Sequence, residues 1–406
     1  MGRLGLLRRS PGFTRLLAAQ TISPLGDAMA TTALILHLQR TVGTPTAVGL
    51  LLFAQAIPPL AAPFAGAIAD RLRPTRLLGA GLLAQAALAG MLALRLPSLG
   101  PLLAIVFLLA LADTPLGAAA GRCIPVVVAD EDLVAANALR GGMRELGTVL
   151  GPPLAGLIFA ASGAQLVLGL DALTFLLAVP LVLGLPEPGP EPALPEPEGG
   201  PGPARRFLGE VRQGLSLIVR TPSLLAIAAG FWVVVFFTAP DDLILPFLAT
   251  TTFRSGPVAV GVLLAAASVG LLIGLPLVGP LGRRLGATAA VVAGFAVMAT
   301  GNLLTAASPW LAGAFAAQVI RGLAIPLADS HVTTQIQRTV RPQLLGRVLS
   351  NVYGGVAVAA AAGYLAGGPV LRATSPRTSF GIVGCGGLIG TAACAILLRR
   401  AGRSSR

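Results

Sequence analysis

The sequence contains no lysine, and aspartate, glutamate and arginine together make up only 11% of its 406 residues. Soluble domains carry about 25% charged residues, so this deficit argues against a soluble fold. The three cysteines (Cys123, Cys385 and Cys394) form no CxxC pair, and His37 and His331 are isolated. These spacings give no metal-ligating or redox motif. We therefore expect no metal and no other cofactor.

The formal net charge is +13, and arginine supplies all of the positive charge, because the sequence has no lysine. Most arginines flank apolar runs at the ends that would face the cytoplasm, which is the distribution of the positive-inside rule. Aromatic residues make up 5% of the chain and do not interleave with a basic stretch. Nucleic-acid binding needs such a surface. The charge therefore predicts membrane orientation and no nucleic-acid partner.

Apolar runs of membrane-spanning length dominate the sequence. About 20 apolar residues are needed for a helix to cross the hydrocarbon core, and we find twelve such runs. The predicted spans cover residues 13–38, 46–69, 76–96, 100–121, 146–163, 165–184, 223–249, 257–280, 287–306, 309–330, 347–371 and 379–399. The even number of spans and the arginine distribution place both termini in the cytoplasm, with the chain in the inner or plasma membrane.

A Pro/Glu-rich segment divides the runs into two groups of six. Residues 185–203 have too few apolar side chains to fold and favour an extended tether. After it, Phe207, Val211, Leu215 and Ile218 recur at helical spacing, which predicts an amphipathic helix at the cytoplasmic face. The predicted domains are an N-terminal half (1–184), a cytoplasmic linker with this helix (185–222) and a C-terminal half (223–406).

The two halves repeat each other nearly in register. The sequence at 47–52 (AVGLLL) recurs at 259–264 (AVGVLL), and the stretch 128–133 corresponds to 340–345, each at an offset of 212 residues. Six spans per repeat give both copies the same direction through the membrane. Parallel repeats of this kind are the arrangement of the two halves of major facilitator transporters.

The loop after the second span carries Gly66, Asp70, Arg71 and Arg76. Their spacing resembles GxxxDRxGRR, the first signature of the major facilitator superfamily, although Arg73 and Pro74 replace two usual residues. In that family the aspartate helps to hold the cytoplasmic side closed, so the resemblance implies a gating loop. The alternative interpretation is a solvated loop charge.

The fifth span contains Gly147, Gly151, Pro152 and Gly156. This row resembles the GxxxGPxxGG signature of major facilitator exporters that work as antiporters. Glycines at this spacing allow close helix approach, and proline removes a backbone hydrogen bond. Small residues at such spacing also occur in other membrane bundles, so simple packing is the alternative.

The first span carries Gln20, Ser23, Asp27 and Thr31 on one helix face. Asp27 lies about 18 Å along the helix from Arg15, near mid-membrane, where an ionised carboxylate is costly. Asp27 is therefore the first candidate for a proton-carrying acid, with a structural, hydrogen-bonded acid as the alternative. The surrounding stretch 18–27 resembles the macrolide-efflux and enterobactin-exporter branch of the family.

Other candidates lie in the fourth, seventh and tenth spans. Asp113 and Arg321 are the remaining charges well inside spans and join Asp27 as proton-coupling candidates; the acid that pairs with Arg321 cannot be read from the sequence. The substrate-cavity candidates are Gln20, Ser23, Thr31, Trp232, Phe236, Asp241 and Gln318. Asp242 adjoins Asp241, and the pair is equally compatible with an interfacial position. Asp171 and Asp329 lie near predicted span ends and receive no function.

The segments 129–137 and 341–347 precede the fifth and eleventh spans, and we expect them to form short cytoplasmic helices that lead into these spans. Both resemble the macrolide-efflux branch. The resemblance implies conformational coupling between the halves.

Together these features predict an all-α membrane protein of twelve transmembrane helices in two parallel six-helix repeats. The predicted function is secondary active export of amphipathic small molecules, drug-like or siderophore-like, by proton antiport with alternating access. The partners are a small-molecule substrate, protons and the lipid bilayer, and we expect a monomer. A proton-coupled uptake symporter and a non-transporting receptor or sensor of the same fold remain alternatives. The sequence shows no nucleophile–His–acid set and no phosphate loop, so we predict no enzymatic activity.

Overall fold

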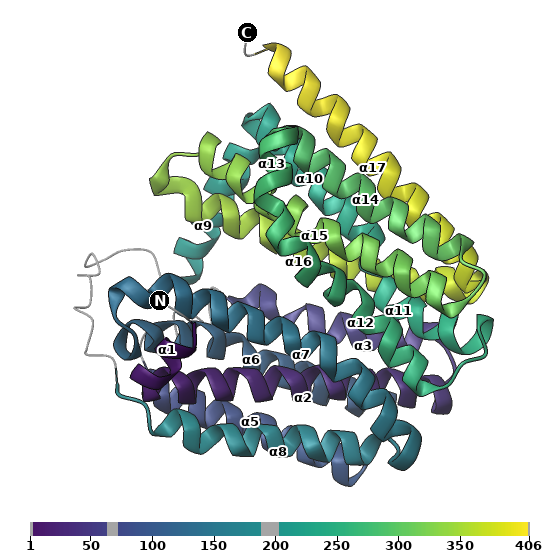
Figure 1. Cartoon of the computed structure of the whole chain (residues 1–406). Helices are drawn as coiled ribbons and strands as arrows, with labels where there is room; N and C mark the ends of the chain where they lie inside the picture. Colours follow the sequence, from purple (N-terminus) through teal and green to yellow (C-terminus); the bar gives the residue numbers. More distant parts are fainter. Residues whose placement is uncertain (1–2, 63–71, 188–202, 405–406) are drawn as a thin grey trace. The chain divides into compact units, whose positions relative to one another are not determined.

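A computed structural model of the chain describes residues 3–62, 72–187 and 203–404, and the regular elements among them are all helical (Figure 1). The chain divides into two compact units. Unit 1 comprises residues 1–43, 54–196 and 255–265. Unit 2 comprises residues 44–53, 197–254 and 266–406.

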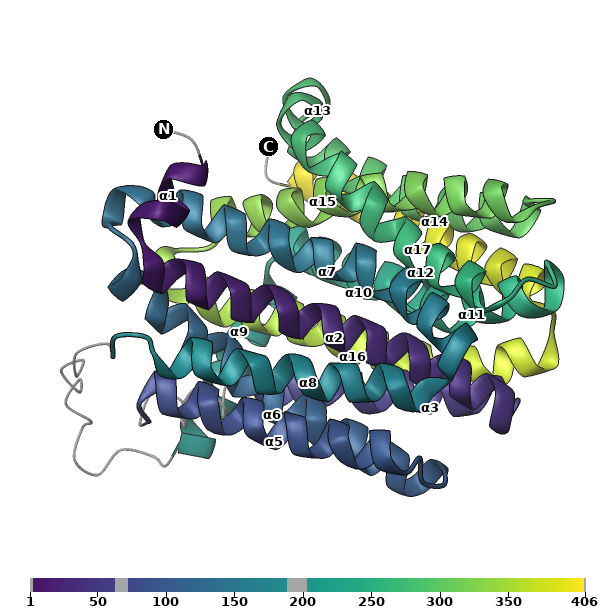
Figure 2. The same cartoon turned by 60° about the horizontal axis from the view of Figure 1, so that its bottom comes forward.

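Unit 1 is built mainly from long helices of the N-terminal half. Its helices are α1 (Arg3–Arg9), α2 (Pro11–Thr41), the 3-10 turn η1 (Pro58–Ala61), α5 (Pro74–Leu94), α6 (Leu99–Val127), the 3-10 turn η2 (Asp130–Asp132), α7 (Leu133–Ser162) and α8 (Ala164–Leu183). Within it, α2 packs against α7 and α8, and α5 packs against α6 and α8, as Figure 2 shows for α2, α8 and α5.

Unit 2 contains the C-terminal half. Its helices are α9 (Pro203–Arg220), α10 (Pro222–Thr238), α11 (Asp241–Phe247), the π-helical turn η3 (Leu248–Thr252), the 3-10 turn η4 (Leu275–Leu277), α13 (Val278–Leu285), α14 (Ala287–Ala307), α15 (Leu311–Thr339), α16 (Pro342–Ala373) and α17 (Pro376–Ser404). Here α10 packs against α16 and α17, and α14 packs against α15 and α17. This pattern repeats that of unit 1 helix for helix, as expected from the sequence repeat.

Two helices are shared between the units. Residues 44–53, in α3 (Pro45–Ala56), belong to unit 2, and residues 255–265, at the start of α12 (Pro257–Gly274), belong to unit 1. Glycines allow each of these two segments to pack closely against a helix of its own unit. A Cβ at Gly49 would lie 2.6 Å from the Tyr364 carbonyl oxygen, and one at Gly261 would lie 2.1 Å from the Pro152 carbonyl oxygen.

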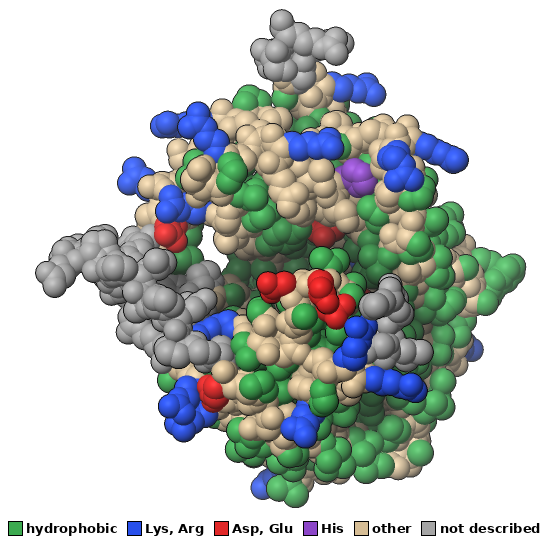
Figure 3. Space-filling view, turned by 60° about the vertical axis from the view of Figure 1, so that its left-hand side comes forward, with side chains coloured by type: hydrophobic (Ala, Val, Ile, Leu, Met, Phe, Trp, Pro, Cys, Tyr) green, Lys and Arg blue, Asp and Glu red, His purple; other side chains and the backbone are tan. Residues whose placement is uncertain are grey.

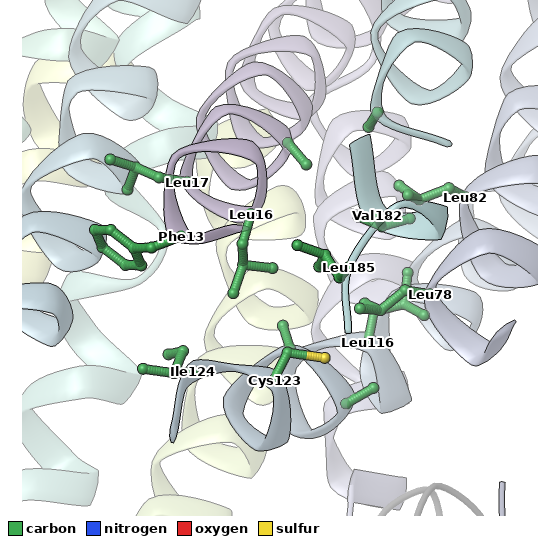
Figure 4. Close-up of a cluster of buried hydrophobic side chains, with 14 of the residues drawn as sticks. Phe13, Leu16, Leu17, Leu78, Leu82, Leu116, Cys123, Ile124, Val182 and Leu185 are labelled. Atoms are coloured by element: carbon green, nitrogen blue, oxygen red, sulfur yellow. The ribbon is translucent and has the colours of Figure 1, made fainter. Parts of the chain in front are cut away.

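The helices form where the sequence supplies a start signal and an apolar stripe. Ser10 caps α2 by accepting a hydrogen bond from the backbone N–H of Phe13, with proline at the first helical position. Apolar side chains from α2, α5, α6 and α8 then meet in the core of unit 1 (Figure 4). Residues labelled there include Phe13, Leu16, Leu78, Leu116, Ile124 and Val182.

Ten of the described helical segments are long and apolar enough to cross a membrane. Helix α2 is long enough at 31 residues but is not among them; polar residues on one face, including Gln20 and Asp27, lower its hydropathy. A shorter apolar segment, Pro45–Ala61, ends beside residues 63–71, which lie outside the described part. Twelve spans are therefore compatible with the structure, and the all-α multi-pass fold is confirmed.

Several predicted boundaries were wrong. The short helices expected at 129–137 and 341–347 lie mostly within α7 and α16, which begin at Leu133 and Pro342 and continue into the spans; the short turn η2 precedes α7. Helix α15 continues to Thr339, nine residues beyond the predicted end at 330. The seventh predicted span, 223–249, lies within one apolar segment, Pro222–Thr252, that contains a turn. The helix breaks there, between α10 and α11 at Pro240, which has no backbone N–H to donate.

A helix, α9, forms where the amphipathic helix before the seventh span is expected, whereas most of the Pro/Glu-rich tether lies outside the described residues. Helix α9 packs on the first turns of α16. Glu210 forms an ion pair with Arg347 (3.6 Å), and the Arg347 guanidinium also donates to Gln213 Oε1 (2.6 Å). Figure 3 views helix ends, where basic side chains gather, while hydrophobic side chains cover the flanks. Both features suit helices that cross a bilayer.

Candidate functional site

Four helices of unit 1 bring three aspartates and one arginine together. Asp27 of α2 interacts electrostatically with Asp113 of α6, Arg144 of α7 and Asp171 of α8. Asp171 is buried, Asp27 is half-buried and Asp113 is exposed. The Gln85 side chain of α5 lies beside the Asp113 carboxylate. The acids outnumber the arginine, so this acid cluster (Asp27, Asp113 and Asp171) can bind a proton.

Close packing of α2 on its neighbours fixes the position of Asp27. Gly26 lets α8 approach, because a Cβ there would lie 2.5 Å from Asp171 Oδ1. On the other side, Cβ atoms at Gly147 and Gly151 would lie 3.2 Å from the Leu25 backbone nitrogen and 2.6 Å from the Ala28 Cβ. Glycine on both sides therefore allows α7 and α8 to enclose the turn that carries Asp27.

The polar face of α2 is only partly paired. Thr31 accepts a hydrogen bond from Gln55 Nε2 (3.0 Å). The Gln20 side-chain oxygen is buried without a hydrogen-bond partner, and Ser23 is half-buried. The predicted residues Gln20, Ser23, Asp27 and Thr31 thus share helix α2, and the predicted Asp113 neighbours Asp27 from α6.

The partner of Arg321 is Asp241. In unit 2, Arg321 Nε lies 2.7 Å from Asp241 Oδ2, with exposed side-chain fractions of 12% and 1%. The same guanidinium donates to the Thr238 carbonyl oxygen (3.4 Å). Arg321 therefore contacts the last residue of α10 and the first residue of α11, on both sides of the Pro240 break.

Sequence reasoning missed two acid–tyrosine pairs in unit 2. Tyr364 of α16 donates to Asp242 Oδ2 (3.3 Å), and Tyr353 of the same helix donates to Asp329 Oδ1 (2.7 Å). Since the predicted tenth span ends at residue 330, the sequence analysis places Asp329 at a span end and gives it no function. The available signal was the position of the only two tyrosines, eleven residues apart and hence on one face of a helix.

The remaining cavity candidates lie at different depths. Gln318 is fully buried between α14 and α15, where its amide donates to Thr305 Oγ1 (3.1 Å) and Asn302 Oδ1 (3.4 Å). Trp232 donates to the Val352 carbonyl oxygen (2.8 Å), and Phe236 packs edge-on to Phe237. Gln318 is therefore part of the helix packing, whereas Trp232 and Phe236 are half-buried.

The predicted gating loop falls mostly outside the described residues. Gly66, Asp70 and Arg71 are not described; Arg76 is exposed in the first turn of α5. The fifth-span row, by contrast, is fully described. Beyond Gly151 it continues to Gly156, where a Cβ would lie 2.5 Å from the Pro257 carbonyl oxygen of α12. Gly147 and Gly151 thus face α2, and Gly156 faces α12.

The described residues contain no group of three His, Cys, Asp or Glu side chains placed to hold a metal ion. In unit 1 the acids are close enough to interact electrostatically but are not grouped as metal ligands.

Comparison with known proteins then identifies the family. The family model described as Major Facilitator Superfamily matches residues 16–250 and 241–406. The chain belongs to the Major Facilitator Superfamily. It is accordingly a multi-pass membrane transporter and not an enzyme.

Relatives of known sequence are distant. An uncharacterised MFS-type transporter, y4rN of Sinorhizobium fredii, is 29% identical over 85% of this chain and 84% of its own length. Macrolide efflux protein A of Streptococcus pyogenes is 21% identical over 83% of this chain and 84% of its own length. These matches support the resemblance to the macrolide-efflux branch.

Solved structures confirm the fold. A point mutant of the nucleoside transporter NupG superposes with a TM-score of 0.79 at 12% identity, covering 95% of this chain and 99% of that chain. A POT family transporter in complex with 5-aminolevulinic acid gives a TM-score of 0.76 at 11% identity, covering 97% of each chain. At these identities the likeness is one of fold.

Proposed function

We propose that this transporter exports amphipathic small molecules in exchange for protons, by alternating access. The observation that carries the proposal is the acid cluster of unit 1, in which Asp27, Asp113 and Asp171 have Arg144 as their one described cationic neighbour. Charged side chains inside membrane spans are costly and are typical of ion and proton pathways. A cluster with more acids than bases reduces that cost by binding protons.

Asp27 is the proposed proton carrier within this cluster. It interacts with both other acids and with Arg144, so its charge affects the whole cluster. Its exposure is intermediate between buried Asp171 and exposed Asp113. A proton bound from the outside would neutralise Asp27 and favour one conformation, and release to the cytoplasm would reset the cycle.

Two observations support export. The relatives named macrolide efflux protein A belong to the branch that the sequence resembles. The fifth-span row of Gly147, Gly151, Pro152 and Gly156 lies at close helix contacts, where a change in helix packing would be transmitted along α7. We further propose a monomer in the cell membrane with both termini in the cytoplasm, as the arginine distribution predicts.

The test is transport by the full chain in proteoliposomes. Vesicles are loaded with lipophilic cations, macrolides or siderophores, and flux is followed with and without an imposed proton gradient. Substrate movement against its own gradient, driven by protons moving the opposite way, is the expected result. Movement in the same direction as protons would replace the antiporter with an uptake symporter.

Asp27→Asn tests the assigned residue. It should abolish gradient-driven transport while leaving folding and gradient-independent exchange intact, because asparagine cannot release a proton. Asp27→Glu, which keeps an ionisable carboxyl at the same position, is the matched control and should retain gradient-driven transport. Unchanged gradient-driven transport by the Asp27 variant would reject Asp27 as the carrier.

A further inference from the structure

We infer that Asp329, held by Tyr353, forms a subsite in unit 2 for the positively charged group of an amphipathic organic cation. The inference rests on the proposed function in one respect only: it assumes that the protein binds small organic molecules. It adds the chemical class of the substrate and the residues that recognise its charge.

Asp329 lies well inside helix α15. It lies ten residues before the end of α15 at Thr339, or about 15 Å at 1.5 Å per residue. Tyr353 lies eleven residues after the start of α16 at Pro342, or about 16 Å. The two residues therefore meet well inside the helices, at matching depth. An ionisable group at such depth needs a partner or a function.

The hydrogen bonds around Tyr353 are directed toward the Asp329 carboxylate. Tyr353 donates its hydroxyl proton to Asp329 Oδ1 (2.7 Å), so the 2.8 Å contact with Thr333 Oγ1 has Thr333 as the donor. The chain of donors thus ends on the carboxylate, which stabilises its negative charge. Asp329 is half-buried. Its second oxygen, Oδ2, accepts no hydrogen bond from the described residues and is not buried. That oxygen is available to a ligand.

The two acid–tyrosine pairs differ in whether an arginine interacts with the acid. Asp242 interacts with Arg321 as well as with Tyr364, so an arginine offsets its charge. Asp329 forms no ion pair among the described residues; its partner is a neutral hydroxyl. Of the two pairs on this face of α16, only the one at Asp329 lacks a described cation.

An aromatic surface lies beside the Asp329 carboxylate. Tyr353 is 37% exposed, and its ring packs edge-to-face against Phe231 (centroids 6.2 Å apart, 82° between planes). Phe231 in turn stacks on the fully buried Phe295 (5.7 Å). An exposed aromatic ring fixed next to a carboxylate suits a cation with an apolar body, since ring faces attract cations.

Binding of two probes to the full-length protein in nanodiscs tests this inference. Tetraphenylphosphonium carries a permanent charge, and triphenylphosphine oxide is a neutral molecule of similar shape. Equilibrium dialysis gives the affinities. Trp232 fluorescence reports whether a probe binds near Tyr353, because the Trp232 N–H donates to the carbonyl oxygen of Val352, the residue before Tyr353. Trp310→Phe removes the only other tryptophan, which is 65% exposed.

Asp329→Asn should weaken tetraphenylphosphonium binding at least tenfold and change triphenylphosphine oxide binding less than twofold. Asp329→Glu should stay within threefold of the native affinity. Tyr353→Phe should weaken only the cation, about threefold, and it carries the test if Asp329→Asn does not fold. The matched control is Asp242→Asn, which should alter neither probe more than twofold.

Three results would overturn the inference: unchanged cation affinity in Asp329→Asn, equal losses for both probes, or an equal effect of Asp242→Asn. The measurement needs no proton gradient. A protein that binds the cation through Asp329 but shows no proton-driven flux would retain the subsite and lose the proposed antiport.

Discussion

Tyr353 and Tyr364 lie eleven residues apart on one face of α16, and each donates its hydroxyl proton to an aspartate of a different helix. These are the only tyrosines in the chain. The contact to Asp242 is longer (3.3 Å) than the contact to Asp329 (2.7 Å). Helix α16 therefore holds α15 at one level and α11 about three turns further along.

The two tyrosine hydroxyls should contribute unequally to stability. We expect Tyr364→Phe to lower the free energy of unfolding by at most about 0.5 kcal/mol and Tyr353→Phe by about 1 kcal/mol, since the shorter bond to a charged acceptor is the stronger one. Thermal unfolding of both variants in the same detergent measures the difference. An equal shift in both variants would contradict the assignment.

The buried ion pair should behave as a unit. Arg321→Gln leaves Asp241, only 1% exposed, without its cation, so we expect a loss of about 3 to 5 kcal/mol. The double variant Arg321→Gln/Asp241→Asn should recover more than half of that loss, because no buried charge is left unpaired. A double-mutant cycle by thermal unfolding measures the coupling; additive losses would show that the pair does not interact.

Glycine at the α12–α15 crossing should be indispensable. A Cβ at Gly322 would lie 2.0 Å from the Ala267 carbonyl oxygen, and backbone atoms cannot move aside as a side chain can. We expect Gly322→Ala to cost about 1 to 3 kcal/mol through overpacking. Gly381→Ala is the control, because nothing lies within 4 Å of the added atom there. Similar melting temperatures for both variants would refute the close crossing.

Docking of α9 depends on a single small residue. A Cβ at Gly214 would lie 2.7 Å from the Arg347 carbonyl oxygen, whereas one at Gly209, on the same helix, would meet nothing within 4 Å. Gly214→Val should therefore release α9 from α16, and Gly209→Val should not. Trypsin cleavage at Arg212 is the measurement, with a several-fold faster rate expected only for Gly214→Val. Equal rates would mean that α9 does not need this contact.

The fold could be predicted from the sequence because each membrane helix can be recognised from its own apolar residues. An apolar run of about 20 residues has one stable form in a bilayer, with its backbone hydrogen bonds inside the helix. The repeat added the pairing of helices, and the structure reproduces it: α2, α7 and α8 pack as α10, α16 and α17 do. Failures came at the ends, where α15 and α16 extend into polar sequence that hydropathy assigns to loops.

The polar sites could be predicted only in part. Asp27, Asp113 and Arg321 stand out because each is a charge inside an apolar run. Their partners come from other helices, and helix rotation, which hydropathy does not fix, decides which side chains meet. The sequence therefore does not predict Asp171 and Arg144 as neighbours of Asp27. It also leaves open which acid pairs with Arg321, and in the structure that acid is Asp241. The transport roles of these residues stay predictions.

The ion pair beside the break at Pro240 restricts which residues homologous proteins can carry at positions 241 and 321. Arg321 contacts Thr238 on one side of the break and Asp241 on the other, so losing either charge alone leaves a buried group without its counterpart. We therefore expect the two positions to change together, through an intermediate that is rarely tolerated. An inheritance constraint of this kind would be visible as covariation between residues 241 and 321 once enough homologous sequences are compared.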